Sequence, residues 1–199
     1  PISVDLAVMR PSVLPNLIAA AGRNADRGLH DAALFEIGNC YWATDAEGQV
    51  LTATGLRSGN ARPRHWSGAA RAADVYDAKA DALAVLEACG VNTANLQIAA
   101  DTPEWYHPGR SGVLRLGPTV LAWFGEIHPA ILGAMKRDES YADFEVFLPR
   151  LPQARKKGPQ KELLRPSPFQ PVGRDFAFIV DETVEAEKIL RAVRGSDKK

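Results

Sequence analysis

The chain has 199 residues, with 24 Lys and Arg against 24 Asp and Glu, so its formal net charge at pH 7 is zero. Hydrophobic residues make up 46% of the chain, which excludes a disordered polymer, and no apolar run approaches the roughly 18 to 20 residues that a membrane-spanning helix needs. Two cysteines exclude a scaffold built on disulfides and fit a reducing compartment, so we expect a cytoplasmic protein.

The first predicted element is a helix. Leu14, Leu17, Ile18 and Ala21 follow the i, i+3, i+4, i+7 spacing of one helical face, and Gly28 is placed to end it. Two stretches rich in β-formers follow, residues 33–42 and 50–56, and the turn residues 45–48 join them as a hairpin. The first third of the chain therefore predicts a helix packed on a pair of antiparallel strands.

A second helix is predicted with Tyr76, Leu83, Leu86 and Cys89 on its apolar face and Gly90 as its end. Further strands are expected near 96–99, 111–116, 120–127 and 144–147, with a short helix near 130–136. Hairpin-length links between successive strands favour an α+β fold, an antiparallel sheet flanked by helices.

The C-terminal part has a different character. Residues 152–199 hold 11 basic and 7 acidic side chains, and residues 152–161 read as a basic linker. A strand at 174–180 and an amphipathic helix follow, and they cannot bury their apolar faces alone. Because the chain also begins with Pro1, we expect a piece of a longer polypeptide. The basic tail is electrostatically suited to an RNA contact, although a solvated linker with ordinary surface charge is an equal alternative.

Six strings, in order along the chain, resemble the β subunit of bacterial phenylalanyl-tRNA synthetase. They are residues 8–15 (VMRPSVLP), 34–38 (LFEIG), 74–79, 107–112 (HPGRSG), 124–129 (FGEIHP) and 171–176 (PVGRDF). The resemblance implies a non-catalytic, class II synthetase-like core at 1–151, a linker at 152–166, and the truncated start of a ferredoxin-fold anticodon-binding domain at 167–199. It also implies an (αβ)₂ heterotetramer with a catalytic α subunit, phenylalanine tRNA as a partner, and ATP and Mg²⁺ as cofactors of the parent enzyme only.

The same resemblance predicts that this piece has no catalytic, cofactor-binding or metal-binding residue. In catalytic relatives the second motif ends in an Arg that meets the α-phosphate of ATP, and here Trp42 stands at that place. The third motif should read Gly-x-Gly-x-x-Arg, but residues 144–151 contain no glycine and keep only Arg150. An indole carries no charge and cannot replace a guanidinium at a phosphate. We therefore expect a structural, tRNA-supporting role.

Candidate RNA contacts are Arg110, Lys156, Lys157 and Arg174. The alternative function is a stand-alone α+β domain that binds a small molecule or anion through the Gly109–Gly112 turn, with Arg110 as the anion partner. That stretch lacks the full phosphate-loop pattern, so a turn into a strand, with Arg110 paired to a carboxylate, is the simpler interpretation.

Other constellations have simpler explanations too. His107 and His128 each precede a proline and have no cysteine at metal-ligand spacing, so strand-ending turns are favoured over a metal site. Cys40 and Cys89 are expected to be small buried hydrophobes. The tryptophans at 66, 105 and 123 are expected to anchor the core or a subunit interface.

Overall fold

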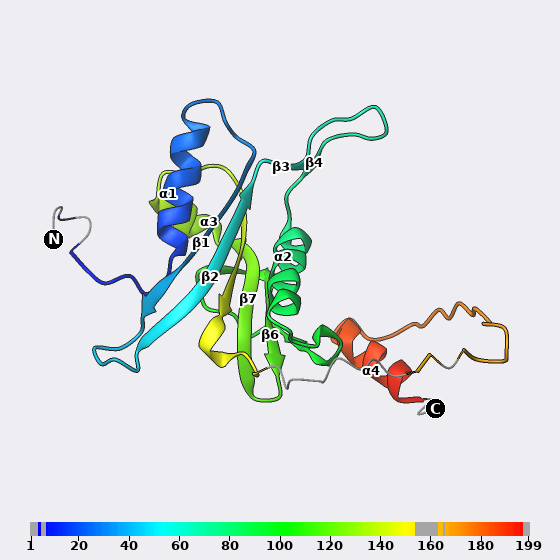
Figure 1. The fold of residues 1–199 in the computed structure, drawn as a ribbon. Helices are drawn as coiled ribbons and strands as arrows, with labels where there is room; N and C mark the ends of the chain where they lie inside the picture. Colours follow the sequence, from blue (N-terminus) through cyan, green and yellow to red (C-terminus); the bar gives the residue numbers. More distant parts are fainter. Residues whose placement is uncertain (1–3, 5–6, 154–162, 165, 197–199) are drawn as a thin grey trace. The chain divides into compact units, whose positions relative to one another are not determined.

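The computed structural model of the protein describes residues 4, 7–153, 163–164 and 166–196. Two compact units divide the chain, Pro1–Ala154 and Arg155–Lys199. The first unit is built on a six-stranded antiparallel sheet with the order β1-β2-β8-β7-β6-β5 (Figure 1). Its strands are β1 (Ala32–Tyr41), β2 (Gln49–Ser58), β5 (Gln97–Ala99), β6 (Tyr106–Leu116), β7 (Thr119–Ile127) and β8 (Tyr141–Phe147).

Helices cover both faces of this sheet (Figure 1). On one face lie α1 (Leu14–Ala25) and α3 (Pro129–Ala134), and on the other lies α2 (Val75–Ala88). Short 3₁₀ turns, η2 (Thr93–Asn95) and η3 (Leu148–Arg150), follow α2 and β8. A hairpin of β3 (Asn60–Arg62) and β4 (Arg71–Ala72) extends from the end of β2. The predicted α+β antiparallel sheet flanked by helices is confirmed.

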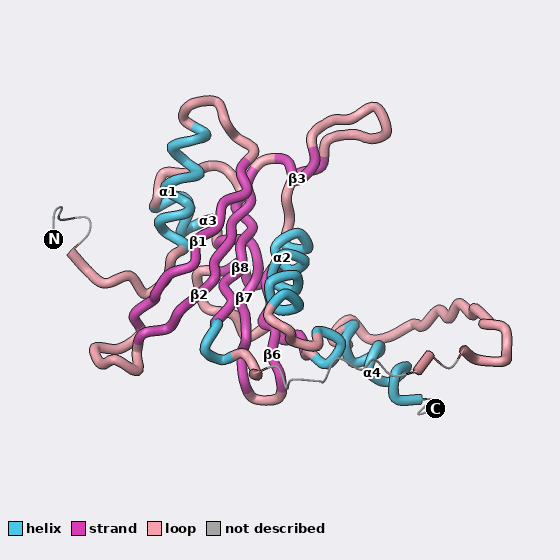
Figure 2. Tube along the Cα trace, in the orientation of Figure 1, coloured by secondary structure: helices cyan, strands magenta, loops and turns pink. Residues whose placement is uncertain are grey.

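The strand period of two separates two hydrophobic cores. Ala53, Phe144 and Val146 point toward α2, whereas Leu56 and Tyr141 join α1 and α3 on the opposite face. Strand β8 is buried along its whole length between β2 and β7 (Figure 2). Any polar side chain on β8 is therefore removed from water.

Local signals explain where the helices begin and end. Helix α1 leads into Gly28, which has a φ of 85°, and α2 leads into Gly90, with a φ of 83°. Both glycines adopt the left-handed conformation that ends a helix without a Cβ penalty. Asp74 caps α2 by accepting hydrogen bonds from the backbone N–H groups of Tyr76 and Asp77.

Two predictions about α2 were wrong. Tyr76 is 74% exposed and Cys89 is also exposed, because the face that meets the sheet is formed by Ala78, Ala82 and Leu86. The small side chains of Ala78 and Ala82, at i and i+4, let the helix approach the strands closely, and Leu86 at i+8 adds apolar contact. Cys40, in contrast, is buried as expected.

The second unit contains helix α4 (Ala186–Ser196), as expected from its amphipathic pattern. The strand predicted at 174–180 is not formed, and Phe176 and Ile179 are exposed. An extended segment becomes a strand only when a neighbour shares its backbone hydrogen bonds, and none of the described residues pairs with this one. No helix within the described ranges is both long and apolar enough to cross a bilayer.

Candidate functional site

The end of β1 carries the side chain that sequence reasoning singled out. Trp42 follows β1 directly, and its backbone N–H donates to the carbonyl oxygen of Gly48 across the β1–β2 hairpin, at 2.8 Å. The indole Nε1 donates to the backbone oxygen of Pro11, 2.9 Å away. The one polar group of this ring is therefore satisfied within the protein, and it is not free for a ligand.

Trp42 belongs to an aromatic cluster on the sheet face that α1 borders. The ring of Trp42 stacks on that of Trp123, with centroids 6.1 Å apart, and meets Phe147 edge-on at 5.1 Å. Trp123 also meets Phe147 at 4.6 Å and Trp105 at 5.6 Å, both at steep angles. Such stacked and edge-to-face pairs are the favoured geometries for aromatic rings, so the cluster is well packed.

Arg150 sits on this cluster. Its guanidinium carbon lies 4.8 Å from the ring centroids of both Trp42 and Phe147. The Nη1 atom donates to the backbone oxygen of Val120 at 3.3 Å. The arginine that the family resemblance matches to the third motif thus covers the tryptophan expected at the place of the second-motif arginine.

Two buried carboxyl groups lie on the same face of the sheet. Asp143 and Glu145, on β8, are 0% and 2% exposed. Tyr106 donates its hydroxyl to Asp143 Oδ1 at 2.7 Å, and Ser12 donates to Glu145 Oε1 at 2.5 Å. The other oxygen of each carboxyl, and the hydroxyl of Thr54 opposite Glu145, have no hydrogen-bond partner among the described residues.

Burial controls the protonation of this pair. Removal from water raises the pKa of Glu145 to about 7, and the hydrogen bond from Ser12 opposes that rise. Burial and the neighbouring negative charge of Glu145 raise the pKa of Asp143 well above its usual range. The floor of this face therefore carries neutral or negative charge, which disfavours a polyphosphate.

A cavity of about 420 Å³ opens beside the aromatic cluster. Six of the residues that line it are Ser12, Leu14, Ile18, Trp42, Trp105 and Trp123. The N-terminal turn of α1 forms one wall and the three indoles form the other. Its size falls in the range of small-molecule sites, and its lining is almost entirely apolar.

The prediction of a turn at Gly109–Gly112 was wrong. These residues continue β6, which pairs with β7 after a shift in register between Tyr106 and Ser111. Arg110 Nε lies 2.6 Å from Glu126 Oε2 on β7, as the simpler interpretation held. Because the cross-strand carboxylate already neutralises this guanidinium, the arrangement is a surface ion pair and not an anion cradle.

The other predicted contacts lie in or near the second unit. Arg174 is exposed and donates to the carbonyl oxygen of its own neighbour, Gly173. Lys156 and Lys157 lie outside the described residues. Arg110 belongs to the first unit and Arg174 to the second, and all four predicted RNA contacts stay predictions.

The predicted strand-ending turn is found at His128, which lies between β7 and α3, but it is wrong for His107, which lies within β6. The Nδ1 atoms of His107 and His128 each accept a backbone N–H two residues ahead, at 3.1 Å. Their rings stack with centroids 6.3 Å apart. Among the described residues, no three metal-ligating side chains converge.

The expectation that the tryptophans anchor the core holds for two of them and fails for the third. Trp123 packs at the centre of the aromatic cluster, and Trp105 joins it at 36% exposure. Trp66 is 91% exposed in the β3–β4 hairpin and contacts His65. It is therefore not part of the core, since a long hairpin tip offers no apolar surface against which to pack.

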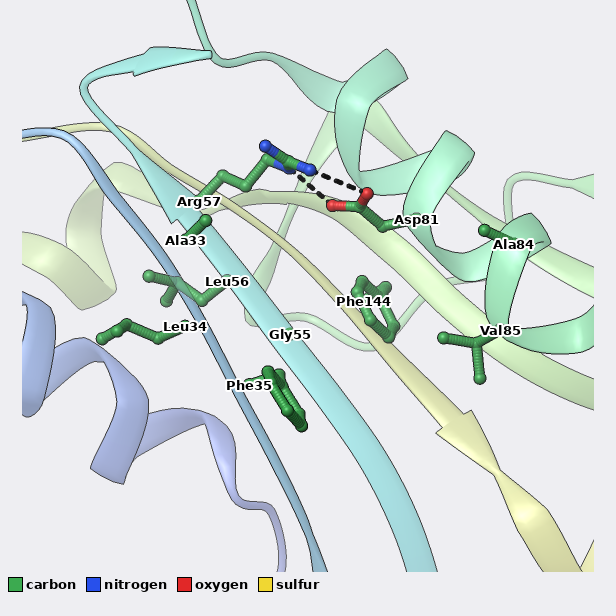
Figure 3. A pocket seen from close by; sticks show the side chains of 10 residues that line it. All are labelled: Ala33, Leu34, Phe35, Gly55, Leu56, Arg57, Asp81, Ala84, Val85 and Phe144. Atoms are coloured by element: carbon green, nitrogen blue, oxygen red, sulfur yellow. Dashed lines mark hydrogen bonds and ion pairs between the residues drawn. The ribbon is translucent and has the colours of Figure 1, made fainter. Parts of the chain in front are cut away.

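A second hollow lies on the α2 side of the sheet (Figure 3). It measures about 280 Å³, with Phe35 and Gly55 on one side and Ala84 and Val85 of α2 on the other. Arg57 and Asp81 close one end with two hydrogen bonds of 2.6 and 2.9 Å. Phe35, which lines the hollow, is 77% exposed, and Ile37, two residues further along β1, is 58% exposed.

The buried acids were missed by sequence reasoning. In β8 the polar residues Asp143 and Glu145 alternate with apolar ones, a pattern that normally places the polar face in water. Only the central position of β8, with α1 and the residue 10–12 segment above it, buries both faces. Tyr106 and Ser12 come from distant parts of the chain, so their pairing with these acids had no local signal.

Comparison with known proteins identifies this architecture. The family model for the phenylalanyl tRNA synthetase beta chain CLM domain matches residues 1–148. The chain belongs to this family. Its whole length is 54% identical to the phenylalanine–tRNA ligase beta subunit of Rhodospirillum rubrum and 51% identical to that of Paramagnetospirillum magneticum, and it spans about a quarter of each relative, 25% in both cases.

Solved structures place the fold of this β-chain family among tRNA synthetases. A pyrrolysyl tRNA synthetase, PylSc of Desulfitobacterium hafniense, matches with a TM-score of 0.53 at 20% identity, over 71% of this chain and 48% of that one. Another structure of the Desulfitobacterium hafniense pyrrolysyl-tRNA synthetase matches at 0.50 and 18%. At this identity the likeness concerns the fold alone. The antiparallel sheet flanked by helices that the sequence predicts agrees with this fold.

Proposed function

We propose that this chain is a structural, non-catalytic part of the β subunit of phenylalanine–tRNA ligase. The enzyme would join phenylalanine to its tRNA in the cytoplasm, using ATP and Mg²⁺ held by a catalytic α subunit. The observation that carries the proposal is the stack of Arg150 on Trp42, 4.8 Å from guanidinium carbon to ring centroid. It occupies the place where the family resemblance expects two phosphate-binding arginines.

Charge supports a non-catalytic role. Adenylate formation requires fixed positive charge around the phosphates of ATP. Here Arg150 is engaged by two aromatic rings and a backbone carbonyl, while Asp143 and Glu145 lie buried on the same sheet face. A triphosphate would meet too little positive charge to be held in a reactive pose.

Phenylalanine-dependent pyrophosphate exchange tests this proposal. The chain alone should give background exchange with ATP and phenylalanine. In the assembled α–β enzyme, Arg150→Gln on this chain should leave kcat within about twofold, because the residue meets no phosphate. Robust exchange by the chain alone contradicts the proposal, as does a hundredfold loss of kcat in an Arg150→Gln enzyme whose assembly is intact.

We further propose that the exposed apolar face of β1 and β2 supports the α subunit. Phe35 and Ile37 lie beside the hollow of Figure 3, whose floor and wall are formed by Gly55, Phe144 and Val85. Interfaces between permanent partners are rich in such apolar and aromatic side chains. The heterotetramer (αβ)₂ expected from the family would use this face for α–β contact.

A charge placed on that face is the corresponding test. Phe35→Lys should weaken α–β association, measured as the concentration at which the assembled particle dissociates in light scattering. Trp66→Lys is the matched control, since Trp66 is also mostly exposed, at 91% against 77% for Phe35, but lies in the β3–β4 hairpin. Equal effects of the two variants, or none, contradict this assignment of the interface.

For residues 167–199 we propose the start of a ferredoxin-fold anticodon-binding domain, with Lys156, Lys157 and Arg174 giving weak tRNA contact. The excess of 11 basic over 7 acidic residues in 152–199 supports a salt-sensitive contribution. In filter-binding measurements, the affinity of the chain for phenylalanine tRNA should fall steeply as the salt concentration is raised. Arg110 is a minor contributor because Glu126 pairs with it. That ion pair also disfavours the alternative anion-binding function.

A further inference from the structure

The β3–β4 hairpin takes no part in the six-stranded sheet or the aromatic cluster, and its tip stands clear of the sheet and helices of the first unit (Figure 1). The residues that form it, 59–73, include three arginines and no acidic residue. Its tip carries Trp66, which is 91% exposed. The hairpin thus combines positive charge with a flat apolar ring, the two features that proteins use to hold unpaired nucleotides.

The base of the hairpin is fixed to the rest of the first unit. Asp31 accepts a hydrogen bond from the backbone N–H of Asn60 at 2.7 Å and another from its side-chain amide at 3.2 Å. Arg71 pairs with Asp77 at 2.6 Å and with Asp74 at 3.2 Å. The charge of Arg71 is therefore neutralised at the start of α2, and this arginine serves to attach the hairpin.

The other two arginines of the hairpin differ from Arg71. Arg62 and Arg64 lie two residues apart on the arm that leads to the tip, and both are exposed. No ion pair joins either guanidinium to an acidic side chain in the part of the chain that the structure describes. Because the hairpin itself has no acid to offset them, both are available to phosphate groups, which guanidinium groups bind through two parallel hydrogen bonds.

A tight turn presents Trp66 at the tip. His65 and Gly68 exchange two backbone hydrogen bonds of 3.0 Å, which leaves Trp66 and Ser67 as the two residues of the turn. Ser67 also donates its backbone N–H to Nδ1 of His65 at 3.4 Å. The indole meets the ring of His65, with centroids 5.2 Å apart. Because the backbone of the turn is already fixed, little conformational freedom is lost when a ligand stacks on this indole.

We propose that the β3–β4 hairpin is an RNA contact, in which Trp66 stacks on an unpaired base and Arg62 and Arg64 bind neighbouring phosphates. The inference rests on the proposed function, which makes tRNA the polyanion that this chain meets. Bases within a double helix are already stacked on one another, so the indole contacts a loop or an end of the tRNA. The hairpin belongs to the first unit, and the contacts proposed above for the basic tail belong to the second.

A protein partner is the competing explanation for the exposed indole, since tryptophan is common at the centres of protein interfaces. The charge of the hairpin favours RNA. A protein would need acidic side chains at matching positions to neutralise Arg62 and Arg64, whereas every nucleotide of an RNA carries a phosphate close to its base. Arginine contacts to the backbone then position the strand, and the indole holds one base.

Filter binding of phenylalanine tRNA to the full chain, repeated over a series of salt concentrations, tests the hairpin. Trp66→Ala should weaken binding about fivefold or more at every salt concentration, because stacking is lost while the charge is unchanged. Trp66→Phe should keep most of the affinity. Arg62→Gln combined with Arg64→Gln should lower the steepness of log affinity against log salt by roughly 1.4 to 1.8, since two phosphate contacts are lost.

The matched control removes the same charge elsewhere on the first unit. Arg23→Gln combined with Arg27→Gln changes two exposed arginines at the end of α1 and should leave both affinity and salt dependence nearly unchanged. Lys156→Gln combined with Lys157→Gln tests the tail separately. If this tail variant lowers the salt dependence and the hairpin variants do not, the proposed tail contact stands and the hairpin contact is overturned.

Thermal unfolding checks that each variant is folded. The proposal is overturned if the unmodified chain does not bind the tRNA, if folded Trp66→Ala binds it as the unmodified chain does, or if the two pairs of arginine substitutions have equal effects. It is also overturned if Trp66→Ala weakens α–β association with unchanged tRNA affinity, which would assign the hairpin to a protein partner. Pyrophosphate exchange remains a separate readout of the proposed function in each case.

Discussion

Gly55 and Phe144 face each other across β2 and β8, and the phenyl ring of Phe144 occupies the space where a side chain on Gly55 would lie (Figure 3). The pattern repeats further along the sheet, where a Cβ on Gly112 would come within 2.7 Å of the Phe124 ring. Phe144 and Phe124 are themselves cross-strand partners. Two glycines thus make room for two aromatic rings that fill the core below α2.

The first prediction concerns Gly55. Gly55→Ala should destabilise the first unit by about 1–3 kcal/mol, because a Cβ there overlaps a ring that is 7% exposed and has little room to move. Urea unfolding measures the change. Gly133→Ala is the control, since Gly133 lies in α3 with open space around it, and alanine there should be neutral or stabilising. Equal destabilisation by both would show that the ring is not the cause.

The main elements of the fold were predictable from local signals. The spacing of Leu14, Leu17 and Ile18 predicted α1, and the turn residues at 45–48 predicted the β1–β2 hairpin. Both signals are local, because the helical period and the turn type depend on residues that are close together in the sequence. The strand at 174–180 was not predictable in the same way. Its residues have high β-propensity, but propensity does not form a strand without a partner.

The candidate site was only partly predictable. Trp42 and Arg150 could be singled out from the sequence, but their contact could not, since it depends on η3 returning under the end of β1. The burial of Glu145 and Asp143 could not be predicted from the sequence, because acidic residues that alternate with apolar ones on a strand normally face water. Their burial depends on the order of strands in the sheet, which places β8 between β2 and β7.

The contact between Trp42 and Arg150 should contribute measurably to stability. A double-mutant cycle with Trp42→Leu and Arg150→Gln should give a coupling energy of about 0.5–2 kcal/mol, the range for a partly desolvated cation–π pair. Trp42→Phe should keep part of it, because a phenyl ring still offers a face to the guanidinium. Additivity within about 0.3 kcal/mol would mean that the two side chains do not interact in solution.

The N-terminus of α2 offers a prediction that distinguishes a cap from an ion pair. Asp74→Ala should cost about 1 kcal/mol, because the N–H groups of Tyr76 and Asp77 lose their acceptor. Asp74→Asn should retain most of the stability, since the amide oxygen still caps the helix. The ion pair from Arg71 to Asp74, at 3.2 Å and about half exposed, should add little. If raising the salt concentration reproduced the Ala effect in the unmodified protein, the cap would not be the source.

Glu145 should make stability depend on pH in an unusual direction. Its pKa is about 7 in the folded chain and about 4.5 when unfolded, so the folded state holds the proton more tightly. Stability should therefore fall as pH rises from about 4.5 to 7 and level off above that. The loss attributable to Glu145 is at most about 3.5 kcal/mol, from roughly 1.4 kcal/mol per pH unit over about 2.5 units. Asp143, whose pKa is raised by the same burial, adds to the fall.

Glu145→Gln isolates this effect. The amide cannot ionise and still accepts the hydrogen bond from Ser12, so the variant should be more stable than the unmodified chain at pH 8 and similar to it at pH 5. Urea midpoints measured across this range give the difference curve, with Glu104→Gln as the exposed control. A difference curve that stays flat between pH 5 and 8 would show that Glu145 titrates as it does in water. In that case its buried setting, with one oxygen unpaired, would not persist in solution, because an ionised carboxylate there without a second donor is disfavoured by its own desolvation.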